Sequence, residues 1–255
     1  MSDKIQIKGR VIGEGKPLIC VPVVEEQKEQ IIDNIKLLAQ KKCDMIEWRM
    51  DCFLQVQNSE EVDEILTAVK PYLDQTILLL TFRSKRQGGA MQLESKEIME
   101  IYLSALKHGV ADLVDVEYFE YVRPTKALAM LKETGVLTVC SHHDFDHTPD
   151  DEVMSMILEK MYAGGADIVK LAVMPNDRED VLRLLNITQS FKKDYPNIPA
   201  ITMSMGKEGV ISRISGEVFG SCVTFGAYEK TSAPGQLPME DLNIILEKIH
   251  NSIEK

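Results

Sequence analysis

The sequence lacks any long hydrophobic run. Among its 255 residues, the longest apolar stretches, such as residues 77–82, are far shorter than the ~20 residues that cross a bilayer. The first ten residues, MSDKIQIKGR, also lack the apolar core of a signal peptide. We therefore expect a soluble, cytoplasmic protein with no membrane partner.

Basic side chains are also scarce. Lys and Arg number 29 against 40 Asp and Glu, and the formal net charge is −11. Such a chain repels a phosphate backbone, so we expect no nucleic acid partner. Gly (15) and Pro (10) are few and 44% of the residues are hydrophobic, which predicts a globular fold with a large core.

Cysteine pairs and nucleotide-binding motifs are missing. No GxGxxG follows a strand pattern and no GxxxxGK[ST] occurs, while His142, His143, Asp144 and His147 are bunched too tightly for a metal motif. The sequence therefore predicts no cofactor and no metal. The cysteines form no CxxC pair and are odd in number, which predicts reduced and mostly buried thiols at Cys20, Cys43, Cys52, Cys140 and Cys222.

What the sequence does contain is a repeated alternation of strand and helix patterns. The first and last strand patterns begin at residues 18 and 218, so each repeat takes about 29 residues, which suits one βα unit. Each pattern is a short apolar, β-branched run followed by a segment of helical periodicity. The eight runs cover residues 18–23, 44–49, 76–82, 113–117, 136–142, 167–172, 200–204 and 218–224.

This alternation predicts an α/β fold, a (β/α)8 TIM barrel formed by residues 1–255 as a single domain. A doubly wound sheet is the alternative, although it usually stops at about six strands. Residues 4–13 (KIQIKGRVIG) alternate like a short β-hairpin, which we expect to cover the N-terminal mouth of the barrel. Residues 25–41 and 151–162 are predicted amphipathic helices, the second burying Val153, Met156, Ile157 and Met161.

Lys170 stands inside an apolar strand run, where an unpaired charge is costly to bury. Strand alternation places Ile168, Lys170 and Ala172 on the same face, which is the interior of a barrel. Desolvation lowers the pKa of a lysine and frees its amine to attack a ketone and form a Schiff base. The alternative is a structural ion pair between Lys170 and an acidic partner such as Glu47.

A histidine pair ends the strand run before that of the lysine. Alternation turns Val139, Ser141 and His143 inward and His142 toward the helices. His143 is therefore a candidate general acid and base beside the lysine. The alternative is a histidine that only hydrogen-bonds carbonyls at the strand end.

Arginines near strand ends suit the recognition of a small anion. Arg83 directly follows a strand run and precedes Gly88 and Gly89, whereas Arg213 lies soon after a later run. A guanidinium binds a carboxylate in a bidentate way, although a surface arginine is the alternative for Arg213. Residues 231–236 follow the last run, where a closing loop is expected.

Together these motifs resemble the type I 3-dehydroquinate dehydratases. Each motif is weak alone, but they occur in order from residue 47 to residue 236 and so cover nearly the whole chain. They are Glu47-Trp-Arg49, Thr81-Phe-Arg83 with Gly88-Gly89, His143-Asp-Phe145, Ile168-Val-Lys-Leu-Ala-Val-Met-Pro175, Ile201-Thr-Met-Ser-Met205, Gly209-Val-Ile-Ser-Arg213 and Ser232-Ala-Pro-Gly-Gln236.

The resemblance implies a cofactor-free hydro-lyase of the shikimate pathway that converts 3-dehydroquinate to 3-dehydroshikimate. It implies that Lys170 forms the Schiff base and that His143 is the general acid and base. It also implies a homodimer and a role in aromatic amino acid biosynthesis, although quinate breakdown uses the same step. Substrate-binding roles are implied for Glu47, Arg49, Arg83, Arg213 as the carboxylate clamp, Ser232, Gln236, Met203, Met205 and Phe225.

One position departs from the family pattern. Gln87 stands where a glutamate often precedes the Gly-Gly pair and is thought to pair with the histidine. A neutral amide can orient an imidazole, but it cannot stabilise an imidazolium by charge. Gln87 and Glu117 are therefore the candidates for orienting His143, and Glu117 or Glu47 for supplying the missing charge.

Two other functions fit the same residues. Another class I Schiff-base lyase of the aldolase type would share Lys170, but the segment around Gly235 is a poor match to a phosphate-binding loop. A non-catalytic module for small carboxylates would use Arg83 and Arg213, with Lys170 as a counter-charge only.

Overall fold

The eight predicted strands form a ring of parallel strands. The computed structural model describes residues 5–254. Within them, one eight-stranded sheet runs in the order β10-β3-β4-β5-β6-β7-β8-β9. Its strands are β3 (Leu18–Val23), β4 (Met45–Arg49), β5 (Ile77–Thr81), β6 (Leu113–Glu117), β7 (Leu137–Asp144), β8 (Ile168–Val173), β9 (Ala200–Ser204) and β10 (Val223–Phe225).

The ring is nearly closed between β9 and β10. Ser221 forms a parallel bridge with Ala200, and the Cys222 amide donates to the Ala200 carbonyl over 2.8 Å. On the other side, β10 pairs with β3 in parallel register, Thr224 opposite Ile19. The expected (β/α)8 barrel is confirmed, and the doubly wound sheet is wrong.

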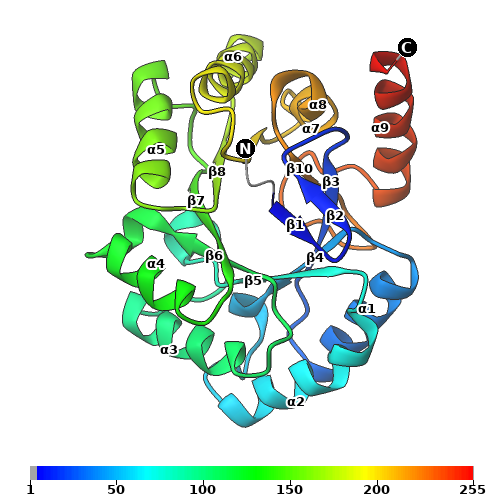
Figure 1. Cartoon of the computed structure of the whole chain (residues 1–255), viewed down its shortest axis with the longest axis vertical. Helices are drawn as coiled ribbons and strands as arrows, with labels where there is room; N and C mark the ends of the chain where they lie inside the picture. Colours follow the sequence, from blue (N-terminus) through cyan, green and yellow to red (C-terminus); the bar gives the residue numbers. More distant parts are fainter. Residues whose placement is uncertain (1–4, 255) are drawn as a thin grey trace.

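Helices surround this ring on its outer side (Figure 1). The longer ones are α1 (Lys28–Gln40), α2 (Ser59–Val69), α3 (Ser95–Leu106), α4 (Pro124–Lys132), α5 (Asp151–Ala163), α6 (Arg178–Asp194) and α9 (Met239–Ile253). Short helices are α7 (Val210–Ile214), α8 (Gly216–Phe219), and the 3-10 turns η1 (Met50–Cys52), η2 (Lys70–Tyr72), η3 (Lys85–Gln87) and η4 (Tyr118–Glu120).

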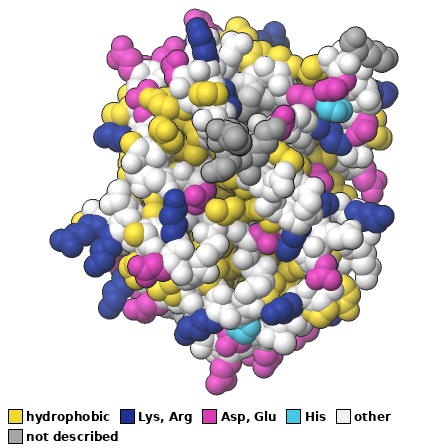
Figure 2. Space-filling view, in the orientation of Figure 1, with side chains coloured by type: hydrophobic (Ala, Val, Ile, Leu, Met, Phe, Trp, Pro, Cys, Tyr) yellow, Lys and Arg dark blue, Asp and Glu magenta, His cyan; other side chains and the backbone are white. Residues whose placement is uncertain are grey.

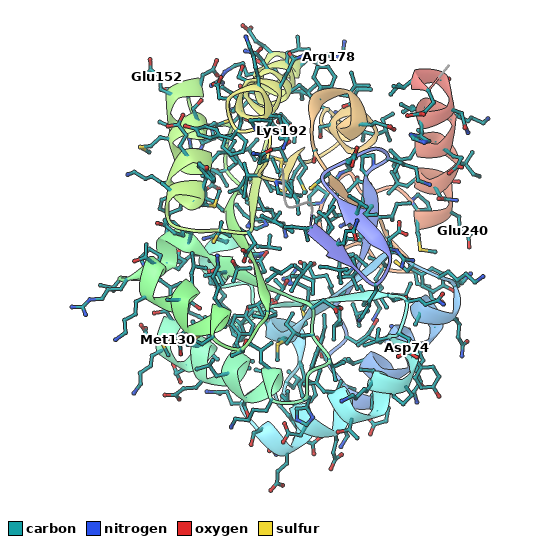
Figure 3. The ribbon with its side chains drawn as sticks, in the orientation of Figure 1. Asp74, Met130, Glu152, Arg178, Lys192 and Glu240 are labelled. Carbon is teal, nitrogen blue, oxygen red and sulfur yellow. The ribbon has the colours of Figure 1, made fainter. Side chains whose placement is uncertain are left out.

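Strand alternation separates the core into two layers. Outward residues such as Trp48, Leu80 and Val114 pack under the helices, whereas inward residues such as Met45 and Leu113 fill the barrel. Figure 3 shows the outer boundary of this packing, with Glu152 on α5, Arg178 on α6 and Glu240 on α9 pointing away from the ring. The inner layer becomes polar toward the carboxyl ends of the strands, where Glu47, Asp115 and Lys170 are buried.

The N-terminal hairpin covers the opposite end. β1 (Ile5–Ile7) and β2 (Arg10–Ile12) pair antiparallel and lie over the opening of the ring (Figure 1). Ile12 is 2% exposed and joins the inner core, while Lys8 pairs with Asp112 and Arg10 with Asp44, both just before a strand. The expected cover of the N-terminal mouth is thus confirmed, except that Lys4 lies outside the described residues.

Two local expectations are wrong. Val218 and Phe219 belong to α8, not to the last strand, because a short apolar run alone does not distinguish a strand from a helical turn. In α5 the core face carries Met154 and Leu158 with Ile157 and Met161, whereas Val153 and Met156 are 39% and 41% exposed. One residue turns a helix by about 100°, so the predicted face was rotated by one position.

The surface mixes both signs of charge. Figure 2 shows Lys and Arg interspersed with Asp and Glu on the face that carries the hairpin. In the described part of the chain, no helix is both long and apolar enough to cross a membrane. All five cysteines are free thiols, and all but Cys52 are buried, as expected.

Candidate active site

A cavity opens at the carboxyl ends of the barrel strands. Most of the residues predicted from the sequence line it, although Arg213 and Glu117 lie behind its wall. The lining consists of Glu47, Arg49, Arg83, Gln87, Gly88, His143, Phe145, Lys170, Ala172, Met203, Met205, Phe225, Ser232, Ala233 and Gln236.

Lys170 lies at the floor of this cavity, with its side chain only 4% exposed. Its Nζ is 3.2 Å from Oδ2 of Asp115 and 3.5 Å from Oε1 of Glu47, and it stands 4.4 Å from the centre of the Phe225 ring. The inward position predicted for the lysine is therefore correct. The predicted ion pair with Glu47 is also present, so the amine is not in a purely apolar environment.

Asp115 is a buried residue of the site that sequence reasoning missed. It accepts hydrogen bonds from Arg83 (2.9 Å), Ser141 (2.5 Å) and Lys170 (3.2 Å). Burial alone raises the pKa of this carboxyl, but the charges of Arg83 and Lys170 outweigh burial and hold the pKa below its ordinary value. The available signal was an acidic residue inside the apolar run LVDVE, at an inward position like that of Lys170 in its own run.

Two of the predicted arginines are already neutralised by carboxylates. Arg49 binds Asp51 through two hydrogen bonds of 2.8 Å each. Arg83 binds Asp115 and Glu117, both over 2.9 Å, and is only 3% exposed. These pairs hold the walls of the cavity rigid, since each buried charge has a partner.

Arg213 differs from these arginines because its guanidinium has no carboxylate partner among the ion pairs of residues 5–254. It donates to the Pro234 carbonyl (2.8 Å) and the Phe225 carbonyl (3.5 Å), and its buried Nε has no hydrogen-bond partner in that part of the chain. Burial without a counter-charge lowers the pKa of Arg213 to about 10. A buried cation of this kind provides a place for an anion next to Met203 and Phe225.

His143 points into the cavity from β7, which pairs with the lysine strand so that Ser141 faces Lys170. Its Nδ1 is 3.2 Å from Oε1 of Gln87, and the same oxygen accepts the His143 backbone N–H over 2.9 Å. Since a backbone N–H can only donate, the Gln87 atom facing the ring is assigned as the carbonyl oxygen. That oxygen favours the tautomer with hydrogen on Nδ1 and leaves Nε2 as an acceptor.

The histidine environment favours a neutral ring. Burial lowers the pKa of His143 well below its ordinary value, and the nearby charges of Arg83 and Lys170 lower it further. Glu117, the other predicted orienting residue, binds Arg83 and the Ser84 N–H. Gln87 therefore supplies the side-chain contact to His143 that Glu117 was also predicted to make.

The Gly88-Gly89 pair shapes the loop that carries Gln87. Gly88 has a φ of 84°, and a Cβ at Gly89 would lie 1.8 Å from the Arg83 carbonyl oxygen. Only glycine permits this close backbone approach. Lys85 and Arg86, in η3 before this pair, are exposed, whereas Arg83 is buried.

A loop between β10 and α9 covers part of the cavity. Gln236 accepts the Ser232 amide N–H (2.8 Å) and donates to the Ser232 hydroxyl (2.9 Å), which ties the loop to itself. The Pro234 carbonyl accepts from Gly206 (3.2 Å) as well as from Arg213. The loop predicted to close over the substrate is thus anchored to the arginine that lacks a counter-charge.

Comparison with known proteins identifies the family. Residues 19–253 match the family model of type I 3-dehydroquinase. The chain is 42% identical to the 3-dehydroquinate dehydratase of Clostridium novyi (strain NT), over 97% of this chain and 98% of that protein. It is also 41% identical to the enzyme of Bacillus subtilis (strain 168), with the same coverage.

Solved structures agree with this match. A type I 3-dehydroquinate dehydratase from Clostridium difficile superposes with a TM-score of 0.93 at 40% identity, covering 99% of both chains. The 3-dehydroquinate dehydratase from Geobacillus kaustophilus HTA426 also gives 0.93, at 35% identity over 98% of this chain and 97% of that one. A Thermotoga maritima synthase at 10% identity shares the fold alone, with a TM-score of 0.59. The chain belongs to the type I 3-dehydroquinase family, whose members are hydro-lyases.

Proposed function

We propose that the chain dehydrates 3-dehydroquinate to 3-dehydroshikimate through a Schiff base on Lys170, with His143 as the general acid and base. The observation that carries this mechanism is the placement of a buried lysine amine and a neutral histidine in one cavity, on the neighbouring strands β8 and β7. An amine and a proton carrier side by side are what imine chemistry on a ketone requires.

The bond changes follow from these two groups. Lys170, which forms ion pairs with Asp115 and Glu47, passes its proton to Nε2 of His143, and the freed amine attacks the substrate ketone carbon. His143 returns that proton to the ketone oxygen, which takes a second proton from the attached nitrogen and leaves as water to give an iminium ion. This ion draws electrons from the adjacent carbon, so His143 removes a proton there through its free Nε2. The electrons form a carbon–carbon double bond, the hydroxyl group leaves with the proton from His143, and water then hydrolyses the imine to release the lysine.

Arg213 is the proposed clamp for the substrate carboxylate. Arg49 and Arg83 are held by Asp51, Asp115 and Glu117, whereas Arg213 has no such partner among the described residues. Glu47, Arg49 and Arg83 then bind or organise the ring hydroxyls, and Ser232 and Gln236 close over them. Met203, Met205 and Phe225 form the apolar walls, where all three side chains are buried.

A related enzyme supports covalent chemistry at this kind of site. The Clostridium difficile enzyme was solved with covalently modified comenic acid. A covalent adduct in a relative with 40% identity over 99% of the chain is consistent with a nucleophile in the shared cavity. In this chain the buried amine of Lys170 is the proposed nucleophile.

Turnover of 3-dehydroquinate, followed by the ultraviolet absorbance of the conjugated product, tests the proposal. The parent protein should form product and Lys170→Ala should not, while the exposed Lys207→Ala serves as a matched control with parent activity. His143→Ala should reduce kcat by roughly 10²–10⁴ because it removes the proton carrier. Substantial turnover by Lys170→Ala would refute the Schiff base, and a parent that binds but never converts the substrate would favour a carboxylate-binding module.

We further propose that the enzyme works in the cytoplasm as a homodimer and that it serves aromatic amino acid biosynthesis. The support is the family relationship to bacterial 3-dehydroquinate dehydratases of the same length. Light scattering during size-exclusion chromatography should give twice the chain mass of 28.7 kDa. A mass equal to one chain would contradict the dimer.

A further inference from the structure

A second hydrogen bond extends the contact between His143 and Gln87. The Gln87 amide uses its oxygen for the histidine and its Nε2 to donate to Oε1 of Glu120 over 3.3 Å. Gln87 ends η3 after β5 and Glu120 ends η4 after β6, so the loops of two neighbouring strands meet beside the histidine. The result is a chain of three groups, His143, Gln87 and Glu120, that begins in the cavity.

Gln87 is neutral, so it cannot supply the negative charge that would stabilise a protonated His143. Glu120, which accepts a hydrogen bond from Gln87, carries a carboxylate. The other carboxylates of the mouth each have a cation as partner that is at most 11% exposed. These carboxylates are Glu47, Asp51, Asp115 and Glu117. The main charges acting on the ring are the cations Arg83, Lys170 and Arg49, all of which disfavour an imidazolium. The cation beside Glu120 is Arg86, 3.2 Å away and 75% exposed, where water screens its charge.

We propose that Glu120 is a positioning residue for the dehydration: through the Gln87 amide, it holds an acceptor oxygen on Nδ1 of His143 and supplies the negative charge that the protonated ring needs. This inference rests on the proposed role of His143. An ionised carboxylate only accepts hydrogen bonds, so it keeps the amide NH2 on its own side and the oxygen on the side of the ring. A charge-assisted bond also polarises the amide toward the histidine.

The first test removes the charge of Glu120 but keeps its size. Glu120→Gln should lower kcat about tenfold with little change in KM. General acid–base catalysis accelerates a reaction by roughly 10²–10⁴-fold, and only part of that acceleration depends on the charge of Glu120. Arg86→Gln is the matched control, since it removes the other partner of Glu120 and leaves the bond to Gln87 intact. Its kcat should stay within about twofold of the parent, as exposed ion pairs contribute little.

The second test moves the carboxylate one position closer to the ring. The double variant Gln87→Glu with Glu120→Gln again places one negative charge in the chain of three groups, and it should recover most of the kcat lost in Glu120→Gln. A role of Glu120 in holding η4 alone would not be rescued by a charge at position 87. A double variant as slow as Glu120→Gln would therefore overturn the proposal.

A third measurement needs no turnover. In a titration followed by the ¹⁵N chemical shifts of the imidazole, the pKa of His143 should fall in Glu120→Gln, should not fall in Arg86→Gln, and should rise in the double variant. An unchanged pKa in Glu120→Gln would overturn the proposal. A parent protein without dehydratase activity would refute the proposed function instead, and the titration would still decide whether Glu120 acts on the ring.

Discussion

Arg213, next to the cavity residues Met203 and Phe225, forms no ion pair with a carboxylate of residues 5–254. Replacing it with alanine should raise KM for 3-dehydroquinate by roughly 10- to 100-fold, since a hydrogen bond to a charged group contributes about 1.5–3 kcal/mol. The exposed Arg178→Ala serves as a control, and Arg213→Lys should recover only part of the affinity because an ammonium lacks the bidentate fork. An unchanged KM in Arg213→Ala would show that the carboxylate binds elsewhere.

The ionisation of Asp115 should make the free energy of unfolding depend on pH. Arg83 and Lys170 overcome the effect of burial and lower its pKa, so its contribution to stability is present above the unfolded pKa of about 3.9 and is lost as pH falls through the folded value. At pH 7, Asp115→Asn should reduce the free energy of unfolding by about 3–5 kcal/mol, because two buried cations lose a counter-charge.

Urea denaturation at pH steps from about 7 to about 3 measures this difference for the parent and Asp115→Asn. The gap between the two proteins should narrow below the unfolded pKa of Asp115. The exposed Asp74→Asn should differ from the parent by no more than about 0.5 kcal/mol throughout. A gap that stays constant or widens on acidification would contradict the assigned partners.

At the residue level, strand alternation predicted which side chains share the cavity but not how they pair. Alternation placed Lys170 and His143 inward, and Glu47 was named as an acidic partner of Lys170; the structure brings all three to one cavity. Asp115 and Glu120 were missed, because a pairing depends on the register of neighbouring strands and on the turns that follow them. Those contacts join residues more than 30 positions apart, which periodicity along the chain does not report.

Among the elements, the loop with the Gly-Gly pair positions Gln87 against His143. Gly89→Ala would place a Cβ 1.8 Å from the Arg83 carbonyl oxygen, so the loop must move and carry Gln87 with it. A displacement of about 1 Å at a catalytic group can cost about 10²-fold, and we expect a fall in kcat of that order. Gly109→Ala is the control.

Gly109 lies in the turn between α3 and β6 and has a positive φ of 60°, but a Cβ added there would meet no atom within 4 Å. Its replacement should cost about 1–2 kcal/mol of stability through backbone strain, without any change in kcat. Circular dichroism melts and steady-state kinetics on both variants separate the two effects. Equal kcat values in Gly89→Ala and the parent would contradict the positioning role of this loop.

Strands buried on both sides were the easiest elements to predict. β3, β6 and β9 begin and end where their apolar runs do. The last strand was harder because α8 supplies Val218 and Phe219 to the same apolar run. The helix ends at the left-handed Gly220, which has a φ of 106°, and β10 begins three residues later at Val223. The prediction of the buried face of α5 was wrong for a similar local reason, since both candidate faces contain Ile157 and Met161.

In the molecule as a whole, the hairpin that we expect to contribute to stability and the cavity that we expect to determine activity lie at opposite ends of the barrel. Ile12 of the hairpin packs into the inner core at the N-terminal mouth, whereas the cavity lies at the carboxyl ends of the strands. Ile12→Ala should lower the free energy of unfolding by about 2–5 kcal/mol with kcat unchanged. Denaturant unfolding and kinetics on this variant check the separation, and a fall in kcat at a temperature where the variant is folded would contradict it.

That residues 1–255 form a single domain remains a prediction. The barrel needs strands from β3 to β10 to complete its ring, so no part of the sheet is closed without the rest. A single unfolding transition seen by both tryptophan fluorescence and circular dichroism would agree with one domain. Two separated transitions would contradict it.

The central claim is that Lys170 forms a covalent imine with the substrate. Intact-protein mass spectrometry after mixing with 3-dehydroquinate and borohydride tests it most directly, with peptide mapping of any adduct. We predict one reduced adduct on Lys170, absent from Lys170→Ala and present in the Lys207→Ala control. Product formation by the parent without any adduct, or an adduct that maps to another lysine, would contradict the mechanism.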